Sequence, residues 1–500
     1  MEHYQQLKER LAEVADIEAA AAVLVWDMRT YMPPGGSEGR AEQLATLEKI
    51  AHQKFTAPEI GDLIEKAGLE TTSLPEEAEE TALVRMARRE YDQQTKLPSD
   101  LVERLARTTS LANQTWVKAK AAADFSLFAP ALEEIVGLQI EKANALGYRG
   151  CPYDALLDLY EPEMKTSQVR ALFAQLREGL VPIVRAIADS SARIETAFLE
   201  QEYGVAKQEA FTRELLQAIG YDFTRGRQDA TAHPFTTSFS PGDVRVTNRF
   251  LPNRPTGAIF AALHEGGHGL YEQGLPERFQ RTPLGHVPSL GLHESQSRLW
   301  ENVVGRSLSF WEHWFPRLAE IFPEQLAGVG VGLFYRAINR VTPSPIRIQA
   351  DEVTYNLHIL LRFEIEIGLI DGTLKVVDLP EIWNARMEEF LGFTPRDDAE
   401  GVLQDIHWSE GYFGYFPTYT LGNLLAVQFY RQALQERPGL GGELEQGQTA
   451  GLLAWLRERI HAEGGKHLPV ELVHRVTGGE LEAAPFLAYL KEKYGPIYGI

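Results

Sequence analysis

The stretch AIFAALHEGGHGLYE, residues 258–272, begins as an apolar helix and then places two histidines, a glutamate and three glycines within six positions. Each glycine inside a helix costs about 0.8–1 kcal/mol relative to alanine. A helix that carries Gly266, Gly267 and Gly269 is therefore weakened by about 2–3 kcal/mol. The sequence predicts that these glycines serve a purpose, and we expect them to let a substrate backbone approach the helix closely.

The polar residues of this stretch form an HExxH motif. His264 and His268 are four positions apart and so lie on one helix face, where both imidazoles reach one metal ion. Glu265 lies at the edge of that face, suited to take a proton from water. In a chain with 13 histidines, the motif is expected by chance at most about 0.05 times. The alternative is a structural helix whose histidines cap or fill space.

A third metal ligand must come from elsewhere in the chain. Tyr271 and Gly274 stand where a metzincin would have its glycine and third histidine, which excludes that class. A following amphipathic helix, LGLHESQSRLWENVVGRSLSFWEHW (residues 290–314), offers Glu294 and Glu301, which are two helical turns apart. Either could be the ligand, and either could be an ordinary solvated glutamate. This pattern leaves both open.

Composition excludes several classes of protein. The chain has 500 residues, 44% of them hydrophobic, and a net charge of −21, which argues against binding of nucleic acids through charge. Cys151 is the one cysteine, so no intrachain disulfide can form. The N-terminus lacks the features of a signal peptide, and no apolar run reaches the roughly 18 residues of a membrane span. We therefore expect a soluble cytoplasmic protein without membrane contact.

Helical patterns dominate the chain. One example is SLPEEAEETALVRMARREYDQQTK (residues 73–96), in which Ser73 is the expected N-cap. The exception is HPFTTSFSPGDVRVTNRF (residues 233–250), which predicts a β-hairpin around residues 240–243. Its edge could pair with an extended peptide. We predict a mainly α fold: a large helical body with a small sheet beside the HExxH helix. We expect residues 1–500 to form a single catalytic domain, and a division into two lobes around a cleft stays open.

Arginine is the side chain best suited to recognise the carboxylate at a peptide's end, because its planar fork pairs with both oxygens. Arg347, which follows VTPSP and is expected to open a helix, is the candidate. The alternative is a surface ion pair of Arg347 with Asp351, and Arg245 is a rival for the clamp.

Further polar side chains between residues 233 and 423 are candidates for supporting roles. Three tyrosines cluster in EGYFGYFPTYTLGN (residues 410–423), and each of them could serve a polar site or be a core aromatic with a satisfied hydroxyl. The carboxylates that could orient the histidine ligands are Asp351, Glu352 and Asp405, and the sequence does not choose among them. His293 and His407 line the cleft or pack inside the protein.

Six motifs occur in the order typical of one peptidase family: HPF (233–235), DVRVT (243–247), HEGGH (264–268), HESQ (293–296), IRIQAD (346–351) and GVLQDIHW (401–408). In these motifs the chain resembles the carboxypeptidase Taq family of HExxH metallocarboxypeptidases. The resemblance implies a mostly helical fold with a deep groove, one Zn²⁺ per chain with Co²⁺ as an alternative, a homodimer, and removal of single residues from peptide C-termini with broad preference.

The resemblance also implies roles for individual residues. His264, His268 and Glu294 match the metal ligands, Glu265 the general base, and Arg347 the clamp for the terminal carboxylate. His233 and Tyr419 match positions that contact the oxyanion and the substrate, and Tyr412 and His407 are expected to bind substrate. We predict a metallocarboxypeptidase that acts on peptides with a free C-terminus. The alternatives are an endopeptidase or dipeptidase of the same zinc class, and a non-catalytic helical peptide-binding protein.

Overall fold

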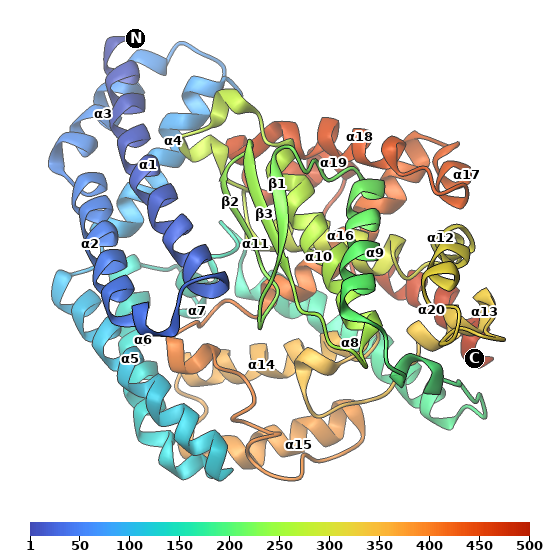
Figure 1. Ribbon diagram of the computed structural model, residues 1–500. Coiled ribbons are helices and arrows are strands. Elements are labelled where there is room, and N and C mark those ends of the chain that lie inside the picture. The colour runs from blue at the N-terminus through green and yellow to red at the C-terminus, as the bar shows by residue number, and fades with distance from the viewer.

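The computed structural model describes residues 1–500 and contains twenty α-helices and three strands (Figure 1). The mainly α fold is thus confirmed. None of the helices is long and apolar enough to cross a membrane. The helices before the sheet are α1 (Glu2–Thr30), α2 (Ser37–Phe55), α3 (Pro58–Thr71), α4 (Glu79–Thr95), α5 (Ser99–Ala122), α6 (Ala129–Leu146), α7 (Tyr153–Leu157), α8 (Thr166–Asp189) and α9 (Val205–Ile219).

The helices after the sheet begin with the metal-motif helix. They are α10 (Pro255–Gly274), α11 (Leu290–Arg298), α12 (Leu308–Ile321), α13 (Val331–Ile338), α14 (Tyr355–Ile370), α15 (Leu379–Leu391), α16 (Pro417–Glu436), α17 (Leu440–Glu445), α18 (Ala450–Arg459), α19 (Pro469–Thr477) and α20 (Ala484–Tyr498). The long core helix α14 is buried on nearly all sides. Helices α1 to α4 stand at one side of the molecule, with the sheet and α10 near its centre (Figure 1).

The sheet has the order β1-β3-β2, with β1 (Gly226–Ala230), β2 (Thr236–Ser240) and β3 (Asp243–Asn248). Strands β2 and β3 pair antiparallel with Thr236 opposite Val246, which confirms the predicted hairpin. Strand β1 joins parallel to β3. Its sequence, GRQDA, has no β-branched or aromatic residue, so nothing in its composition marks it as a strand. Both β2 and β3 contact α10, so the sheet lies beside the metal helix as expected.

Apolar side chains gather in two clusters. The larger one spans most of the body and includes α10, α11, α14 and α16. The smaller one joins α1, α2, α3 and α4, with Phe279 and Leu284 packed into it. The N-terminal helices therefore have a core of their own that meets the rest of the chain at one side.

Two predicted helix boundaries are wrong. Helix α4 begins at Glu79 with Ala78 at its N-cap, not at Ser73, because Pro75 disfavours helical geometry at the residue before it and the chain makes turns there instead. The helix expected over residues 290–314 is divided into α11, a π-helical turn at Leu299–Val304, and α12.

Candidate metal centre and substrate site

His264, His268 and Glu294 come together between α10 and α11. One ligand atom from each lies within 4.8 Å of the other two. Oε2 of Glu294 is 3.4 Å from Nε2 of His268 and 3.7 Å from Nε2 of His264. Ligand atoms that surround a zinc ion tetrahedrally at about 2.0–2.1 Å lie roughly 3.3 Å from one another. The side chains thus leave a space of the right size between them.

The glycines of the motif explain how α11 comes so close to α10. A Cβ atom on Gly267 would lie 2.5 Å from the main-chain oxygen of Gln296 and 2.7 Å from Cα of Ser297. A Cβ atom on Gly422 of α16 would likewise lie 2.7 Å from Cβ of Glu294. Helices α10 and α16 therefore both approach α11 closely through glycines.

The other two glycines also face protein atoms. A Cβ atom on Gly266 would lie 2.6 Å from Leu216 of α9, and one on Gly269 would lie 2.8 Å from Tyr221 and 3.2 Å from Val246 of β3. The expectation that these glycines admit a substrate backbone is therefore wrong. The space that they leave is filled by α9, α11 and the sheet, and their purpose is close packing around the metal-motif helix.

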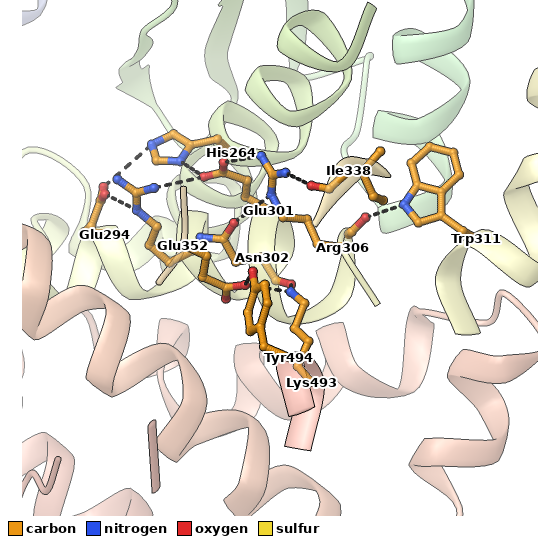
Figure 2. A network of polar contacts seen from close by, with 12 residues as sticks. His264, Glu294, Glu301, Asn302, Arg306, Trp311, Ile338, Glu352, Lys493 and Tyr494 are labelled. Atoms are coloured by element: carbon orange, nitrogen blue, oxygen red, sulfur yellow. Dashed lines mark hydrogen bonds and ion pairs between the residues drawn. The ribbon is translucent and has the colours of Figure 1, made fainter. Parts of the chain in front are cut away.

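Glu301, the second glutamate that the sequence left open, supports the histidine. Its Oε2 lies 2.9 Å from Nδ1 of His264, so Nε2 of that ring is left to face Glu294 (Figure 2). Arg298 joins the two carboxylates, since its Nε donates to Oε1 of Glu294 at 2.7 Å and its Nη1 donates to Oε2 of Glu301 at 3.2 Å. A carboxylate behind a metal-ligating histidine fixes the ring orientation.

None of the three carboxylates that the sequence offered as partners for the histidine ligands contacts either histidine, so the candidates Asp351, Glu352 and Asp405 are wrong for that role. Asp351 accepts from the main-chain N–H groups of Val353 and Thr354 ahead of α14. Glu352 pairs with Lys493 of α20 at 2.7 Å, and Lys493 also donates to the main-chain oxygen of Asn302 in the π-helical turn (Figure 2). Asp405 forms ion pairs with Arg347 and Arg362. The signal for Glu301 was its two-turn spacing from Glu294, which indicates a shared helix face but not the distance to each histidine.

Ion pairs and burial set the protonation states of the centre. Burial would raise the pKa of Glu294 and Glu301, but the neighbouring Arg298 and His264 outweigh it, holding the pKa of Glu294 well below its usual value and that of Glu301 at about 2. Burial, together with nearby His293, lowers the pKa of His268 to about 3. Burial would also lower the pKa of His264, but Glu294 and Glu301 outweigh it and raise that pKa. Glu294 and His268 are thus in the forms that bind metal, whereas a metal ion competes with a proton at His264.

His293 packs against this centre without entering it. Its ring stacks on His268 with centroids 4.2 Å apart, and its Nε2 lies 3.1 Å from Oε1 of Glu272. Of the two alternatives that the sequence left open for His293, these contacts favour packing inside the protein. Nδ1 of His268 is buried and has no hydrogen-bond partner.

Glu265 lies beside a cavity of about 490 Å³ whose other lining residues include Phe260, His264 and Ile338. Its side chain is buried, and its Oε2 accepts a hydrogen bond of 2.7 Å from Oγ1 of Thr236 on β2. Burial raises the pKa of Glu265. His233 lies on the exposed loop between β1 and β2, next to Pro234, which lines the same cavity.

Arg347 is only 5% exposed and lies on a single 3₁₀ turn, Arg347–Gln349, rather than at the start of a helix. Its Nε and Nη2 both donate to Oδ1 of Asp405, at 3.1 and 2.8 Å, and its Nη1 donates to the hydroxyl of Tyr355. The alternative of a surface pair with Asp351 is therefore wrong. Arg362 pairs with the other oxygen of Asp405 at 2.6 Å.

An aromatic cluster lies over Arg347. Its guanidinium carbon is 5.1 Å from the centroid of the Tyr419 ring, and Tyr419 is 5.4 Å from Tyr415. His407 packs 5.5 Å from Tyr415, and the exposed Tyr412 lies 5.7 Å from Tyr415. The structure thus brings Tyr412, His407, Tyr419 and Arg347 into one group. Tyr419 belongs to α16, whereas Tyr412 and Tyr415 lie on the preceding loop.

A buried glutamate that the sequence did not single out holds this loop. Oε1 of Glu366 accepts from Nε1 of Trp408 at 2.9 Å, and its Oε2 accepts from the hydroxyl of Tyr153 and from the main-chain N–H of Gly414. Burial raises the pKa of Glu366 to about 7. No motif marks it, and Glu364 two positions earlier in the same helix gives the sequence no reason to prefer it.

A helical chain with HExxH on one helix and a glutamate on the next, all within reach of one ion, has the architecture of a metallopeptidase. Comparisons with known proteins agree: the pattern of the carboxypeptidase Taq (M32) metallopeptidase family matches residues 6–494. The chain is 46% identical to thermostable carboxypeptidase 1 of Thermus thermophilus over 99% of each chain. It is 38% identical to carboxypeptidase 1 of Bacillus subtilis over 98% of this chain and 97% of the relative.

Comparison with a solved structure also indicates this family. The M32 carboxypeptidase from Deinococcus radiodurans superposes with a TM-score of 0.97 at 40% identity, with both chains covered completely. The chain belongs to the carboxypeptidase Taq (M32) family and is a metal-dependent carboxypeptidase, a hydrolase that acts on peptides.

Proposed function

We propose that His264, His268 and Glu294 hold one Zn²⁺ ion per chain, with Co²⁺ as an alternative. The observation that carries this proposal is the convergence of the three ligand atoms within 4.8 Å. The distances between Nε2 and Oε2 match those of a tetrahedral site, and Glu301 leaves Nε2 of His264 free. Two imidazoles and a carboxylate suit Zn²⁺, Co²⁺ or Mn²⁺.

We propose Glu265 as the general base. When bound, the divalent cation supplies Lewis acidity, which lowers the pKa of water toward ~7 and polarises the substrate carbonyl. Glu265 accepts the proton of the attacking water and passes it to the leaving amine. The burial that raises the pKa of Glu265 makes it a better proton acceptor.

Arg347 is the proposed clamp for the substrate's terminal carboxylate. Arg347 and Arg362 share a single counter-ion, Asp405, so this buried group carries one positive charge in excess. One N–H of Arg347 remains on each of Nη1 and Nη2 after its hydrogen bonds to Asp405 and Tyr355. These two donors suit a carboxylate, and its negative charge balances the cluster.

His233 and Tyr419 are proposed to donate to the oxyanion that forms when water attacks, and Tyr412 and His407 to contact the substrate. Support comes from the packing of Tyr419 on Arg347 and from the position of His233 next to Pro234 at the cavity beside Glu265. Loss of one oxyanion donor typically costs about 2.7–4 kcal/mol of transition-state stabilisation.

The remaining proposals concern the whole protein. We propose that residues 1–500 act as a single catalytic domain with a deep substrate groove, that the enzyme is a cytoplasmic homodimer, and that it releases single residues with broad preference. The family pattern spans residues 6–494, which supports one domain, and the resemblance to the family implies the groove, the homodimer and the broad preference. The single cysteine, Cys151, suits a reducing compartment.

The test combines metal analysis with mass spectrometry of one peptide over time. We expect about one Zn²⁺ or Co²⁺ per chain, and a ladder that shortens from the free C-terminus. A C-terminally amidated peptide should be cut poorly. Glu265→Gln should keep the metal and lose at least about 100-fold in kcat. Arg347→Lys should raise KM for free-acid peptides because a lysine cannot form the fork.

Each assignment has a result that would contradict it. Unchanged turnover by Glu265→Gln would contradict the role of Glu265 as the base. Equal cleavage of amidated and free-acid peptides would contradict the role of Arg347, and metal retained after alanine replaces all three ligands would contradict the metal site.

A further inference from the structure

Thr236 touches the proposed base at two points. Its Oγ1 lies 2.7 Å from Oε2 of Glu265 and 2.9 Å from the main-chain oxygen of the same residue. The first contact is the one hydrogen bond that the Glu265 side chain makes. Because the hydroxyl engages Oε2, the other carboxylate oxygen is left without a hydrogen bond from the protein, and rotation of the carboxylate about its terminal bond is restricted.

The place of Thr236 is set by the sheet. The residue before it, Phe235, donates through its main-chain N–H to Oγ1 of Thr247 at 2.8 Å, and its carbonyl accepts from the N–H of Thr247 at 2.9 Å. Thr236 then pairs with Val246 of β3. Val246 in turn meets α10 at Gly269, where only a glycine leaves room. The strand, and with it the hydroxyl, is thus fixed relative to the helix that carries the base.

We propose that Thr236 is a positioning residue, whose hydroxyl holds the carboxylate of Glu265 in the orientation that accepts a proton from the attacking water. The inference rests on the proposed function, because it needs Glu265 to be the base. It also gives a role to the HPF motif: the loop at residues 233–235 delivers Thr236, the first residue of β2, to the helix that carries the proposed base.

Thr236→Val tests the proposal, since valine has the shape of threonine without the hydroxyl. We expect kcat to fall about 10- to 100-fold, because small misplacement of a catalytic group has effects of that size. KM and the metal content should stay unchanged, because Thr236 touches neither the clamp nor the metal ligands. Thr236→Ser keeps the hydroxyl and should retain at least about a third of the wild-type kcat. Thr237→Val, one position along the strand with no side-chain hydrogen bond, is the matched control and should leave kcat unchanged.

A double-mutant cycle of Thr236 with Glu265 distinguishes a positioning role of Thr236 from a purely structural one. In a Glu265→Gln background, where residual activity does not depend on the base, Thr236→Val should lower kcat no further. Wild-type kcat in Thr236→Val would overturn the inference, as would an equal additional loss in the Glu265→Gln background. If the valine variant folds poorly, the comparison of Thr236→Ser with Thr236→Ala at equal metal content replaces it, and equal kcat in those two would overturn the inference.

The same data distinguish a failure of the role of Thr236 from a failure of the role of Glu265. An inactive Glu265→Gln with a fully active Thr236→Val removes only the role of Thr236. Turnover retained by Glu265→Gln removes the proposed base itself.

Discussion

The substitution Gly267→Ala tests why the metal helix carries glycine. Alanine at this position would gain about 1 kcal/mol of intrinsic helix propensity. Its Cβ atom, however, would lie 2.5 Å from the main-chain oxygen of Gln296 and 2.7 Å from Cα of Ser297. Relief requires α11 to move by about 1 Å, since main-chain atoms cannot rotate away. Overpacking of this kind typically costs 1–3 kcal/mol.

Two consequences follow from that movement. The free energy of unfolding of the metal-free protein should fall by up to about 2 kcal/mol, since the gain of about 1 kcal/mol in helix propensity offsets part of the overpacking. Glu294, which lies on α11, should also move away from His264 and His268. Metal ligands are held within about 0.2 Å of their ideal distances, so a shift of about 1 Å should weaken metal binding at least 10-fold.

The assay is chemical denaturation of the metal-free protein, together with competition for the metal by a chelator. Gly137→Ala in α6 is the matched control, because nothing lies within 4 Å of the Cβ atom there. That variant should be more stable by up to about 1 kcal/mol, with unchanged metal affinity. If Gly267→Ala keeps wild-type stability and metal affinity and only KM rises, the packing explanation is refuted. Gly267 would then be explained by close approach of the substrate.

Two further predictions concern buried carboxylates. Glu301→Gln should weaken metal binding about 10- to 100-fold by loosening the His264 ring, measured by chelator competition, and an unchanged affinity would contradict the supporting role of Glu301. Burial raises the pKa of Glu161 to about 7, so between about pH 4.5 and 7 the folded protein holds a proton that the unfolded chain has lost. This contribution makes the free energy of unfolding fall as the pH rises to about 7 and stay level above it. Denaturation at pH 5, 6, 7 and 8 should show a flatter profile for Glu161→Gln than for the wild type, and identical slopes would speak against it.

Features that depend on local geometry could be predicted from the sequence alone. The spacing of His264 and His268 places both imidazoles on one face of any helix that forms there, and Glu265 follows at its edge. The hairpin at residues 236–248 was readable in the same way, because its turn and its alternation are encoded within a few residues. The order of six short motifs added the family, and with it the mostly helical fold.

The sequence could not predict how residues far apart in the chain come together in the site. Glu294 and Glu301 are equivalent on a helical pattern, and the approach of α11 to α10 through Gly267 decides that the first meets both histidines while the second supports one of them. Asp405 reaches Arg347 across 58 residues of chain. The physical reason is that helix periodicity acts over four or five residues, whereas contacts between helices are set by which side chains are small enough to let two backbones approach.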